Sequence, residues 1–591
     1  MSAHDEEVLG KAYDGRLMRR LLGYVRPYRS SVALAIAAII GHSLLELVPP
    51  YLTKVVIDSS IPARDTRSIG LLALTYLACL VASFALEYLQ TWTMQMTGQR
   101  IMFDLRMQLY GHLQRLDVSF YDKHPVGRLM TRVTTDVDAL NDLFTSGVVS
   151  IFGDAFTLVG IMGVLVWMDW RLALVAFSVL PLIALVAQWF RQNVRASYRN
   201  VRAWVARINA FLQEHITGVS TSQLFRREKA DFAAFDDIDR HHRDANLQSI
   251  VYYAVFYPAI EIVSALATAL LIWIGGGWVL GDVLTIGSLV AFVQYAQRFF
   301  RPISDMSEKF NVLQSAMASS ERIFTLLDTP VEIAPNLTTT VAPARVRAEG
   351  PGHIRFEHVT FSYVPGQPVL EDVSFEIHPG QRVGLVGATG SGKTTIVSLL
   401  LRFYDVQAGR ITIDGVDVRE MEVRALRARF GLVLQDVYLF SGTIADNVRL
   451  GRADLSDDAV RAALQAVHAD GFVSRLPGGL DAAVVERGAT LSVGQKQLLS
   501  FARALAFDPP VLVLDEATSS VDTDTERLIQ DALARLMRGR TTLAIAHRLS
   551  TIQDMDQILV LHKGRLRESG THQQLLAARG LYRRLYELQF A

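Results

Sequence analysis

The stretch 387–395, which reads GATGSGKTT, has the residue types and the spacing of a loop that binds phosphate. Its glycines let the backbone turn so tightly that several N–H groups point at one anion, and Lys393 adds a positive charge for the outer phosphates. The hydroxyl of Thr394 is placed to bind a magnesium ion. An accidental lysine in a glycine-rich turn is the alternative, but the apolar runs 383–386 and 396–403 predict the flanking strand and helix. The sequence therefore predicts a nucleotide-phosphate site.

A second candidate element is the apolar run 511–514, which reads VLVL and is followed by Asp515 and Glu516. A run that is apolar on both faces is typical of a central strand of a parallel sheet. At the carboxyl end of such a strand, Asp515 is placed to hold magnesium through water and Glu516 to orient the attacking water or accept its proton. Alone this pattern is weak, but beside the phosphate-binding loop it indicates an ATPase.

The elements that must position these residues lie in 352–591, where strand-like and helical runs alternate as in an α/β domain with a largely parallel sheet. Residues 329–351 are rich in Pro, Thr and Ala and show no periodic pattern, so we expect a linker there. Residues 1–328 are mostly apolar and helical in pattern. The sequence thus predicts a helical domain, a linker and an α/β domain.

Composition narrows the class of protein further. A chain of 591 residues is too long for one core, and a mean hydropathy of +0.24 with 20% charged residues fits one half in lipid and one half in water. The net charge is zero, so nothing in the balance indicates nucleic acid. Cys79 is the only cysteine, which excludes an intrachain disulfide and a cysteine-based metal site. No signal peptide is evident at the amino terminus.

Six apolar segments are long enough to cross a bilayer as helices, which takes about 20 residues each. They are 32–56, 69–89, 148–168, 172–190, 253–280 and 284–300, of which the fourth is the weakest. Arginines gather before the first segment and in the long connections 93–145 and 191–250. By the positive-inside rule, both termini, the long connections and the α/β domain face the cytoplasm, which predicts a multi-pass protein of the cytoplasmic (inner) membrane.

The two long inner connections are helical in pattern and charged, so we expect them to extend the membrane helices into the cytosol. Each turns at a short segment, 120–128 in the first connection and 224–228 in the second. A plain helical hairpin is the alternative, which the pattern alone does not exclude.

Ionisable residues fall inside the predicted spans and invite two interpretations. They are His42, Glu46, Glu87, Asp154 and Glu261. Charge in lipid is costly, so such groups usually face the bundle interior or a water-filled cavity. They either line a path for a transported compound or proton, or they form hydrogen bonds between helices.

The signature of a known family lies shortly before the second candidate element. Residues 491–495, LSVGQ, resemble the signature of the ABC ATPases, which normally reads LSGGQ. In matching order and spacing stand Gln435 after a strand, Asp522 in the run SSVD, and His547 after the run TLAIA. Tyr363 resembles the aromatic residue that stacks on adenine. With six spans in front, nearly the whole chain resembles an ABC exporter half-transporter of the multidrug and lipid type.

The resemblance implies ATP and Mg²⁺ as ligands and assigns roles to single residues. The nucleotide would be bound by Tyr363, Gly387, Thr389, Gly390, Ser391, Gly392, Lys393, Thr394 and Thr395. Magnesium would be held by Thr394, Gln435 and Asp515. Catalysis would fall to Glu516, which polarises the water, to His547 at the γ-phosphate, and to Gln435. Nucleotide binding across a dimer would involve Ser492, Gly494, Gln495 and Asp522.

The resemblance also implies a second half-transporter, whose nucleotide the signature of this chain would cover, and contacts from the inner turns 120–128 and 224–228 to the ATPase domains. Val493 departs from the family pattern, which has glycine there. A β-branched side chain would obstruct the approach to phosphate, so we expect a heterodimer whose competent site uses Lys393, Asp515 and Glu516 of this chain. A homodimer that tolerates Val493 is the alternative.

The expected function is ATP-driven efflux of a hydrophobic or amphipathic compound, such as a drug, lipid or peptide. An ATP-gated channel or regulator, and a nutrient importer of the same architecture, are the alternatives. A channel would show ion current without ATP-driven net flux, and an importer would show the opposite direction of flux. The sequence does not fix the compound, because fold does not determine cargo.

Overall fold

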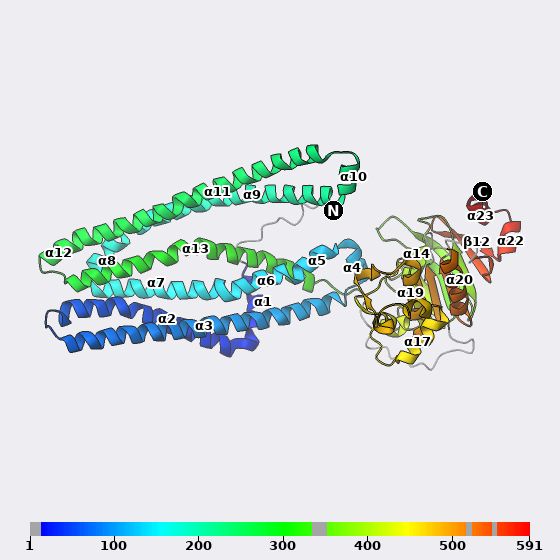
Figure 1. Cartoon of the computed structure of the whole chain (residues 1–591), viewed down its shortest axis with the longest axis horizontal. Coiled ribbons are helices and arrows are strands. Elements are labelled where there is room, and N and C mark those ends of the chain that lie inside the picture. Colours follow the sequence, from blue (N-terminus) through cyan, green and yellow to red (C-terminus); the bar gives the residue numbers. More distant parts are fainter. Residues whose placement is uncertain (1–13, 334–351, 516–522, 546–551, 591) are drawn as a thin grey trace. The chain divides into compact units, whose positions relative to one another are not determined.

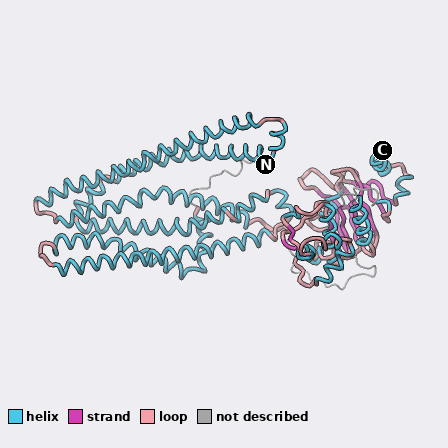
Figure 2. The backbone as a smooth tube through the Cα atoms, viewed as in Figure 1, coloured by secondary structure: helices cyan, strands magenta, loops and turns pink. Residues whose placement is uncertain are grey.

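A computed structural model of the chain describes residues 14–333, 352–515, 523–545 and 552–590. The chain divides into two compact units. The first comprises residues 1–114 and 125–329, and the second comprises residues 115–124 and 330–591. In the described residues strands occur only in the second unit, and the first is built from helices (Figure 2). The short segment Arg115–His124 belongs to the second unit although its neighbours on both sides belong to the first.

The helices of the first unit include several far longer than a bilayer is thick. They are α1 (Gly15–Val25), α2 (Arg29–Val55), α3 (Thr66–Leu113), α5 (Val126–Val133), α6 (Thr135–Asp142), α7 (Val148–Met168), α8 (Trp170–Phe177), α9 (Leu180–Thr217), α10 (Val219–Leu224), α11 (Glu228–Leu270), α12 (Gly276–Leu280) and α13 (Ile286–Leu327). Figure 1 shows α2 beside α3 and α9 beside α11, and these are the most extensive helix pairings in the unit.

Five stretches of helix in the described part of the chain are long and apolar enough to cross a membrane. They are Gly15–Ser60, Thr66–Leu113, Ile151–Met168, Trp170–Thr217 and Glu228–Leu280. These stretches contain the first, second, fourth and fifth predicted spans and most of the third. The sixth predicted span falls almost entirely within α13, where the side chains of 300–308 are not described, and it stays a prediction. The chain is a membrane protein.

The fourth predicted span is not one continuous helix. It is divided between α8 and α9, which are separated at Ser178 and Val179. Pro181 is the second residue of α9, and it has no N–H to donate to the carbonyl of Phe177. Ser178 instead bonds the preceding turn, with its Oγ donating to the carbonyl of Val175 at 2.7 Å. The helix over 172–190 is therefore interrupted at these two residues, although the span itself is confirmed as part of the stretch Trp170–Thr217.

The membrane helices are tied to one another by polar side chains that the sequence placed inside the spans. The Nδ1 of His42 lies 2.9 Å from Oγ of Ser83, which joins α2 to α3. Asp154 of α7 accepts a hydrogen bond from Lys309 of α13. For these residues the structure favours hydrogen bonding between helices over a lining role. Glu46 lies 3.8 Å from the His42 ring on the same helix, whereas Glu87 and Glu261 are exposed in the single chain.

A pair of prolines inside α2 leaves helix carbonyls without their usual partners. Pro50 has no N–H to donate to the carbonyl of Glu46, four residues earlier. Arg298 of α13 replaces it, with Nη1 donating to that carbonyl at 2.5 Å. The hydroxyl of Tyr295 donates to the next carbonyl, that of Leu47. The proline pair therefore fastens α2 to α13 through side chains.

The described residues of the second unit form three sheets: one of six strands, one of four, and the short pair β7 and β8. Its helices include α4 (Val118–Lys123), α14 (Lys393–Leu400), α15 (Val423–Arg427), α16 (Ile444–Arg449), α17 (Asp457–Ala466), α18 (Asp470–Val473), α19 (Val493–Ala506), α20 (Thr523–Met537), α22 (His572–Ala577) and α23 (Leu581–Phe590). Its strands are β1 (Ile354–Phe361), β2 (Leu370–Ile377), β3 (Arg382–Val386), β4 (Ala408–Ile413), β5 (Val416–Asp417), β6 (Phe430–Val433), β7 (Gly442–Thr443), β8 (Ala483–Val484), β9 (Val511–Asp515), β10 (Thr541–Ile545), β11 (Gln557–His562) and β12 (Arg565–Gly570).

The larger sheet has the strand order β12-β11-β3-β10-β9-β6, and all of its pairings are parallel except that of β11 with β12. All of its strands except the edge strand β12 are buried on both faces. In β9, Leu512 and Leu514 pack with the core on the side of α19 and α20, while Val511 and Val513 pack with α14 and the second sheet. This agrees with the predicted parallel sheet and the continuous apolar run.

The second sheet, β2-β1-β4-β5, is antiparallel throughout, and the sequence analysis did not predict it. Its strands alternate between buried and accessible residues, because only one face packs on the core. Phe356 and Phe375 stack at 4.4 Å between ring centroids. The α/β prediction holds for the second unit as a whole, and the expectation of a largely parallel sheet holds for the larger sheet.

A buried ion pair between α6 and α13 gives a prediction about stability. Asp136 is 4% exposed and accepts hydrogen bonds from Arg322, at 2.9 and 2.5 Å, and from Ser319, at 3.0 Å. We expect Asp136→Ala to lower the free energy of unfolding by about 2 kcal/mol, because it removes charged hydrogen bonds at a buried position. The midpoint of thermal unfolding in detergent measures this loss.

The matched control is Asp138→Ala on the same helix. Asp138 pairs with Arg106 at 2.5 Å, but its side chain is 66% exposed, so the cost should stay below about 1 kcal/mol. Equal shifts in the two variants would show that burial at Asp136 adds nothing to the pair.

Candidate nucleotide site

The predicted phosphate-binding loop connects β3 to α14, and its glycines are required by close contacts. A Cβ on Gly387 would lie 2.4 Å from the carbonyl oxygen of Leu561, and one on Gly392 would lie 2.6 Å from Cδ2 of Leu370. Gly390 and Gly392 have φ angles of +79° and +104°, in the region that favours glycine. The backbone of the loop is therefore packed against β2 and β11 with no room for side chains at these two contacts.

Lys393 is the first residue of α14, and its ammonium group is turned back over the loop. Nζ donates to the carbonyls of Gly387 at 2.7 Å and Ala388 at 3.1 Å. Burial lowers the pKa of Lys393 below its usual value, and the charge of Asp515 acts in the opposite direction. Phosphate oxygens are stronger acceptors for an ammonium group than neutral carbonyls, so this lysine is placed to exchange one set of partners for the other.

Ser391 provides an independent test of whether the loop fits a phosphate ligand. The residue is 4% exposed, and its Oγ is buried without a hydrogen-bond partner among the described residues. A buried hydroxyl without a partner costs free energy, and a bound anion would supply one. The unpaired hydroxyl, the glycine contacts and the lysine together fit a nucleotide phosphate.

Two threonines after the lysine differ in their surroundings. Thr394 is exposed, whereas Thr395 is 5% exposed and its Oγ1 accepts a hydrogen bond from the Tyr363 hydroxyl at 3.2 Å. The ring of Tyr363 is 42% exposed and packs edge-on against Tyr404 at 5.1 Å between centroids. The structure thus brings the predicted adenine-stacking residue next to the loop. Thr389 is exposed within the loop itself.

Parallel pairing brings the other predicted residues to the edge of the sheet that carries the loop. Ile545 of β10 is paired with both Leu385 of β3 and Asp515 of β9, so Asp515 lies two strands from the loop and level with its start. Gln435 follows β6 by two residues and is exposed. Asp515 and Gln435 therefore lie toward the edge of the sheet that carries the loop, and their assignment to a metal stays a prediction.

Three predicted residues lie outside the described part of the chain. Glu516 follows the last residue of β9, His547 follows β10 by two residues, and Asp522 precedes α20. Their assigned roles remain predictions from the sequence.

The signature segment forms the beginning of α19. Ser492 caps the helix, with its Oγ accepting from the N–H of Gln495 at 3.2 Å, and the Gln495 side chain accepts from the N–H of Ser492 at 2.9 Å. Ser492 is exposed and Gly494 is buried. The free N–H groups of the first turn make this end of the helix a favourable place for an anion.

Val493 is the first residue of α19, and its φ is not positive, so this backbone does not require glycine. The side chain of Val493 is 56% exposed at the end of the helix where an anion would approach, and the expected steric obstruction stays a prediction.

Several residues that shape the site were not found from the sequence. Gly564, in the β11–β12 turn, donates its N–H to the carbonyl of Ser391 at 3.2 Å, and its φ is +75°. A turn at Lys563-Gly564 could be predicted from the sequence, but its contact with the phosphate-binding loop could not. Arg503 of α19 donates to the carbonyls of Asn447 at 2.9 Å and Tyr438 at 3.3 Å, which links the signature helix to the segment that follows Gln435.

The short helix α4, which contains part of the predicted inner turn 120–128, packs within the second unit. Asp122 accepts a hydrogen bond from the hydroxyl of Tyr404. Burial raises the pKa of Tyr404, and the hydrogen bond to Asp122 raises it further. Asp117 accepts from the N–H groups of Glu332 at 2.7 Å and Ile333 at 3.2 Å. Residues 224–228, the second predicted turn, fall in the first unit.

The fold and the site together define a nucleotide-hydrolysing domain joined to a helical membrane domain. The family model of the ABC transporter transmembrane region matches residues 32–303, and that of the ABC transporter matches residues 370–519. The chain therefore belongs to the ABC transporters, in the class of exporter half-transporters that couple ATP hydrolysis to transport, and it binds ATP.

Individual relatives match almost the whole chain. An uncharacterized ABC transporter ATP-binding protein of Bacillus subtilis, YknV, is 40% identical over 99% of this chain and 96% of its own length. The ATP-dependent lipid A-core flippase of Thiobacillus denitrificans is 37% identical over 97% of this chain and 98% of its own. The solved structure of a bacterial Atm1-family ABC exporter with ATP bound is 29% identical, with a TM-score of 0.77 over 95% of this chain and 98% of its own.

The Ser391 hydroxyl, which has no partner among the described residues, gives a prediction that distinguishes an effect on ATP binding from an effect on the stability of the fold. We expect Ser391→Ala to weaken ATP binding about tenfold, because it removes a hydrogen bond to a charged group worth roughly 1.5 kcal/mol. The stability of the nucleotide-free protein should be unchanged or higher, because the hydroxyl has no partner to lose among the described residues. Calorimetric titration with ATP and thermal unfolding without nucleotide measure the two effects.

Ser398→Ala is the matched control, because that hydroxyl donates to the carbonyl of Thr394 within α14 and lies outside the loop. It should leave ATP affinity unchanged. Wild-type ATP affinity in Ser391→Ala would contradict the assignment of this hydroxyl to phosphate.

Proposed function

We propose that this chain uses ATP to move a hydrophobic or amphipathic compound out of the cell across the cytoplasmic membrane. The observation that carries the proposal is the phosphate-binding loop, with its unpaired Ser391 hydroxyl, on the same chain as the membrane helices. The similarity to a lipid A-core flippase supports a lipid-like compound that enters from the bilayer. The arginine-rich connections support an orientation with both termini and the ATPase domain in the cytoplasm.

In the proposed ATP site, the loop residues from Gly387 to Lys393 hold the phosphates. Their backbone N–H groups and the Ser391 hydroxyl donate hydrogen bonds, and Lys393 supplies positive charge to the β- and γ-phosphates. Tyr363 stacks on adenine, and its hydrogen bond to Thr395 fixes the ring beside the loop. The partly buried Lys393 is restrained by two carbonyls of the loop, which limits the conformational freedom that is lost when ATP binds.

Mg²⁺ fits the oxygen-bearing side chains of Thr394, Gln435 and Asp515, and when bound it would neutralise charge on the phosphates. Glu516 is proposed to polarise the attacking water, and His547 to contact the γ-phosphate. Both follow strands that end at the edge of the sheet where the loop lies.

The site is proposed to be completed by a second half-transporter. The exposed Ser492 and the N–H groups at the start of α19 form an anion site. The segment around them does not itself bind a nucleotide, so this site suits a nucleotide that another subunit holds. Gly494, Gln495 and Asp522 would act at the same interface. ATP would then hold two subunits together, and hydrolysis would release them.

Val493 supports an unequal pair of subunits. Its exposed branched side chain lies at the start of α19, where it would meet the nucleotide of the partner. The loop of this chain, in contrast, has every residue of the phosphate-binding pattern. We therefore favour a heterodimer in which the nucleotide bound by Lys393 is the one that is hydrolysed.

The function is tested by transport into inverted membrane vesicles, in which ATP added outside reaches the ATPase domain. We expect ATP-dependent accumulation of ethidium or of a fluorescently labelled phospholipid when this chain and its partner are present. Glu516→Gln should bind ATP but abolish both hydrolysis and accumulation, because the water is no longer polarised. Normal steady-state hydrolysis in Glu516→Gln would overturn the role of this residue, and ATP-dependent loss of the probe would indicate import.

The unequal pair is tested with the purified chain alone. We expect little hydrolysis from the wild-type chain and a severalfold rise in Val493→Gly, because the smaller residue lets the signature approach phosphate. Val493→Ile, which keeps a branched side chain, should stay at the wild-type level. If the wild-type chain alone hydrolyses ATP and a transported compound stimulates it, the heterodimer proposal fails.

A further inference from the structure

Three residues that no part of the nucleotide site uses lie together at one end of β1 and β2. Arg355 is paired with Glu376 in the antiparallel register, which places His353 directly opposite His378. Alternation along the strands puts His353, Glu376 and His378 on one face of the sheet. Their neighbours Ile354 and Ile377 point to the other face and are fully buried. The three side chains therefore share the outer face of the antiparallel sheet.

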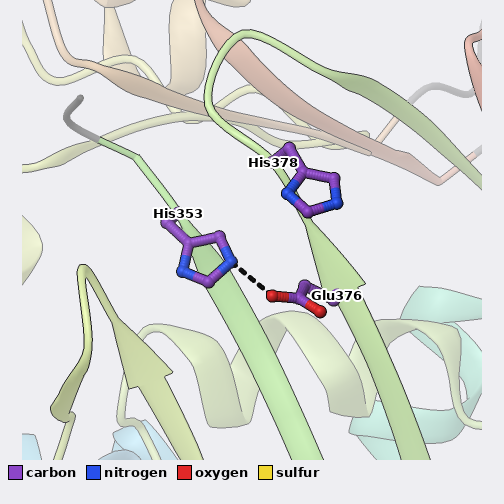
Figure 3. Close-up of side chains that lie close together, drawn as sticks. All are labelled: His353, Glu376 and His378. Carbon is purple, nitrogen blue, oxygen red and sulfur yellow. Dashed lines mark hydrogen bonds and ion pairs between the residues drawn. The ribbon is translucent and has the colours of Figure 1, made fainter. Parts of the chain in front are cut away.

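Their distances are short enough for a shared ligand. Nε2 of His353 lies 2.7 Å from Oε1 of Glu376, and the His353 and His378 rings stack at 5.8 Å between centroids with an interplanar angle of 20°. One ligand atom from each of the three residues lies within 4.8 Å of the other two. Figure 3 shows both imidazole rings and the carboxylate gathered at the same end of the two strands.

A simple histidine–carboxylate hydrogen bond does not account for the third residue. The same two strands carry such a pair at their other end, where His358 lies 2.7 Å from Asp372, and both side chains are more than 70% exposed. At His353 the side chain is only 15% exposed, and a second imidazole stands over it. The ring of His378 makes no hydrogen bond to any described residue, so its nitrogen atoms are available to a ligand.

We propose that His353, Glu376 and His378 form a binding site for one divalent transition-metal ion, with Zn²⁺ as the ion that suits it. Two imidazoles and one carboxylate are ligands that zinc accepts, and three protein ligands leave a fourth position for water. Bonds of about 2 Å in tetrahedral geometry place ligand atoms about 3.3 Å apart, which small rotations of the exposed His378 and Glu376 achieve. The ion takes the place of the proton between His353 and Glu376, and that proton is released to solvent.

The position of the site gives the ion a structural consequence. The N–H groups of Gly352 and His353 are bound by Oδ1 of Asp414, at 2.7 and 2.9 Å, at the first described residues of the α/β domain. On the other strand, the carbonyl of His378 accepts from Gln381 at 3.0 Å, in the turn that enters β3 and hence the phosphate-binding loop. The ion would join the start of β1 to this turn. It would stabilise the folded domain, because the unfolded chain does not hold the three ligands together.

The test uses the full chain in detergent, purified through a tag that contains no histidine. Titration calorimetry with ZnCl₂ should show one saturable Zn²⁺ per chain, and CoCl₂ should give the visible absorption of a tetrahedral site. His353→Ala and His378→Ala should each weaken Zn²⁺ binding by at least about tenfold, because each removes a direct ligand. Zn²⁺ should raise the midpoint of thermal unfolding of the wild-type chain and not of His378→Ala.

His358→Ala is the matched control, because it removes an exposed histidine from the same strand pair and leaves the three ligands in place. It should bind Zn²⁺ as the wild type does. Since His378 is exposed, its substitution leaves the core intact, so unchanged Zn²⁺ affinity in His378→Ala would overturn the proposal. Equal losses in His358→Ala and His378→Ala would overturn it too, because they would indicate scattered surface binding.

Discussion

The contact between the backbone of Gly387 and the carbonyl of Leu561 is the constraint on which the nucleotide site depends. It presses the loop against β11, while Gly392 meets Leu370 on the other side. Within the loop packed in this way, Lys393 is buried and donates to the carbonyls of Gly387 and Ala388. The Ser391 hydroxyl is buried without a hydrogen-bond partner among the described residues. A parallel order of strands then brings Asp515 to the same edge.

The parts of the fold that the sequence predicted are those with local causes. Apolar runs and closely spaced glycines identified β3, the loop and β9 because each signal lies within a dozen residues. The antiparallel sheet was missed, because its pairing joins β1 to β4 across more than 40 residues and its strands are apolar on one face only. The break between α8 and α9 had a local signal in Pro181, but the apolar run masked it. The hydrogen bond between Asp122 and Tyr404 spans 282 residues, and no pattern in the sequence could have indicated it.

Polar residues in the membrane helices fall into two groups that composition alone could not separate. His42 and Asp154 are bound by side chains of neighbouring helices, so their free energy of burial is already offset within one chain. Glu87 and Glu261 are not buried in this way, because their side chains are exposed in the single chain. The second group therefore places carboxylates on a surface where water, a second subunit or a passing compound would meet them.

The proline pair of α2 has a mechanical consequence. In an ordinary helix, each turn is joined to the next by backbone hydrogen bonds whose geometry tolerates little bending. At Glu46 the hydrogen bond that Pro50 cannot donate comes instead from the long side chain of Arg298 of α13. A displacement of α13 would therefore act directly on the middle of α2.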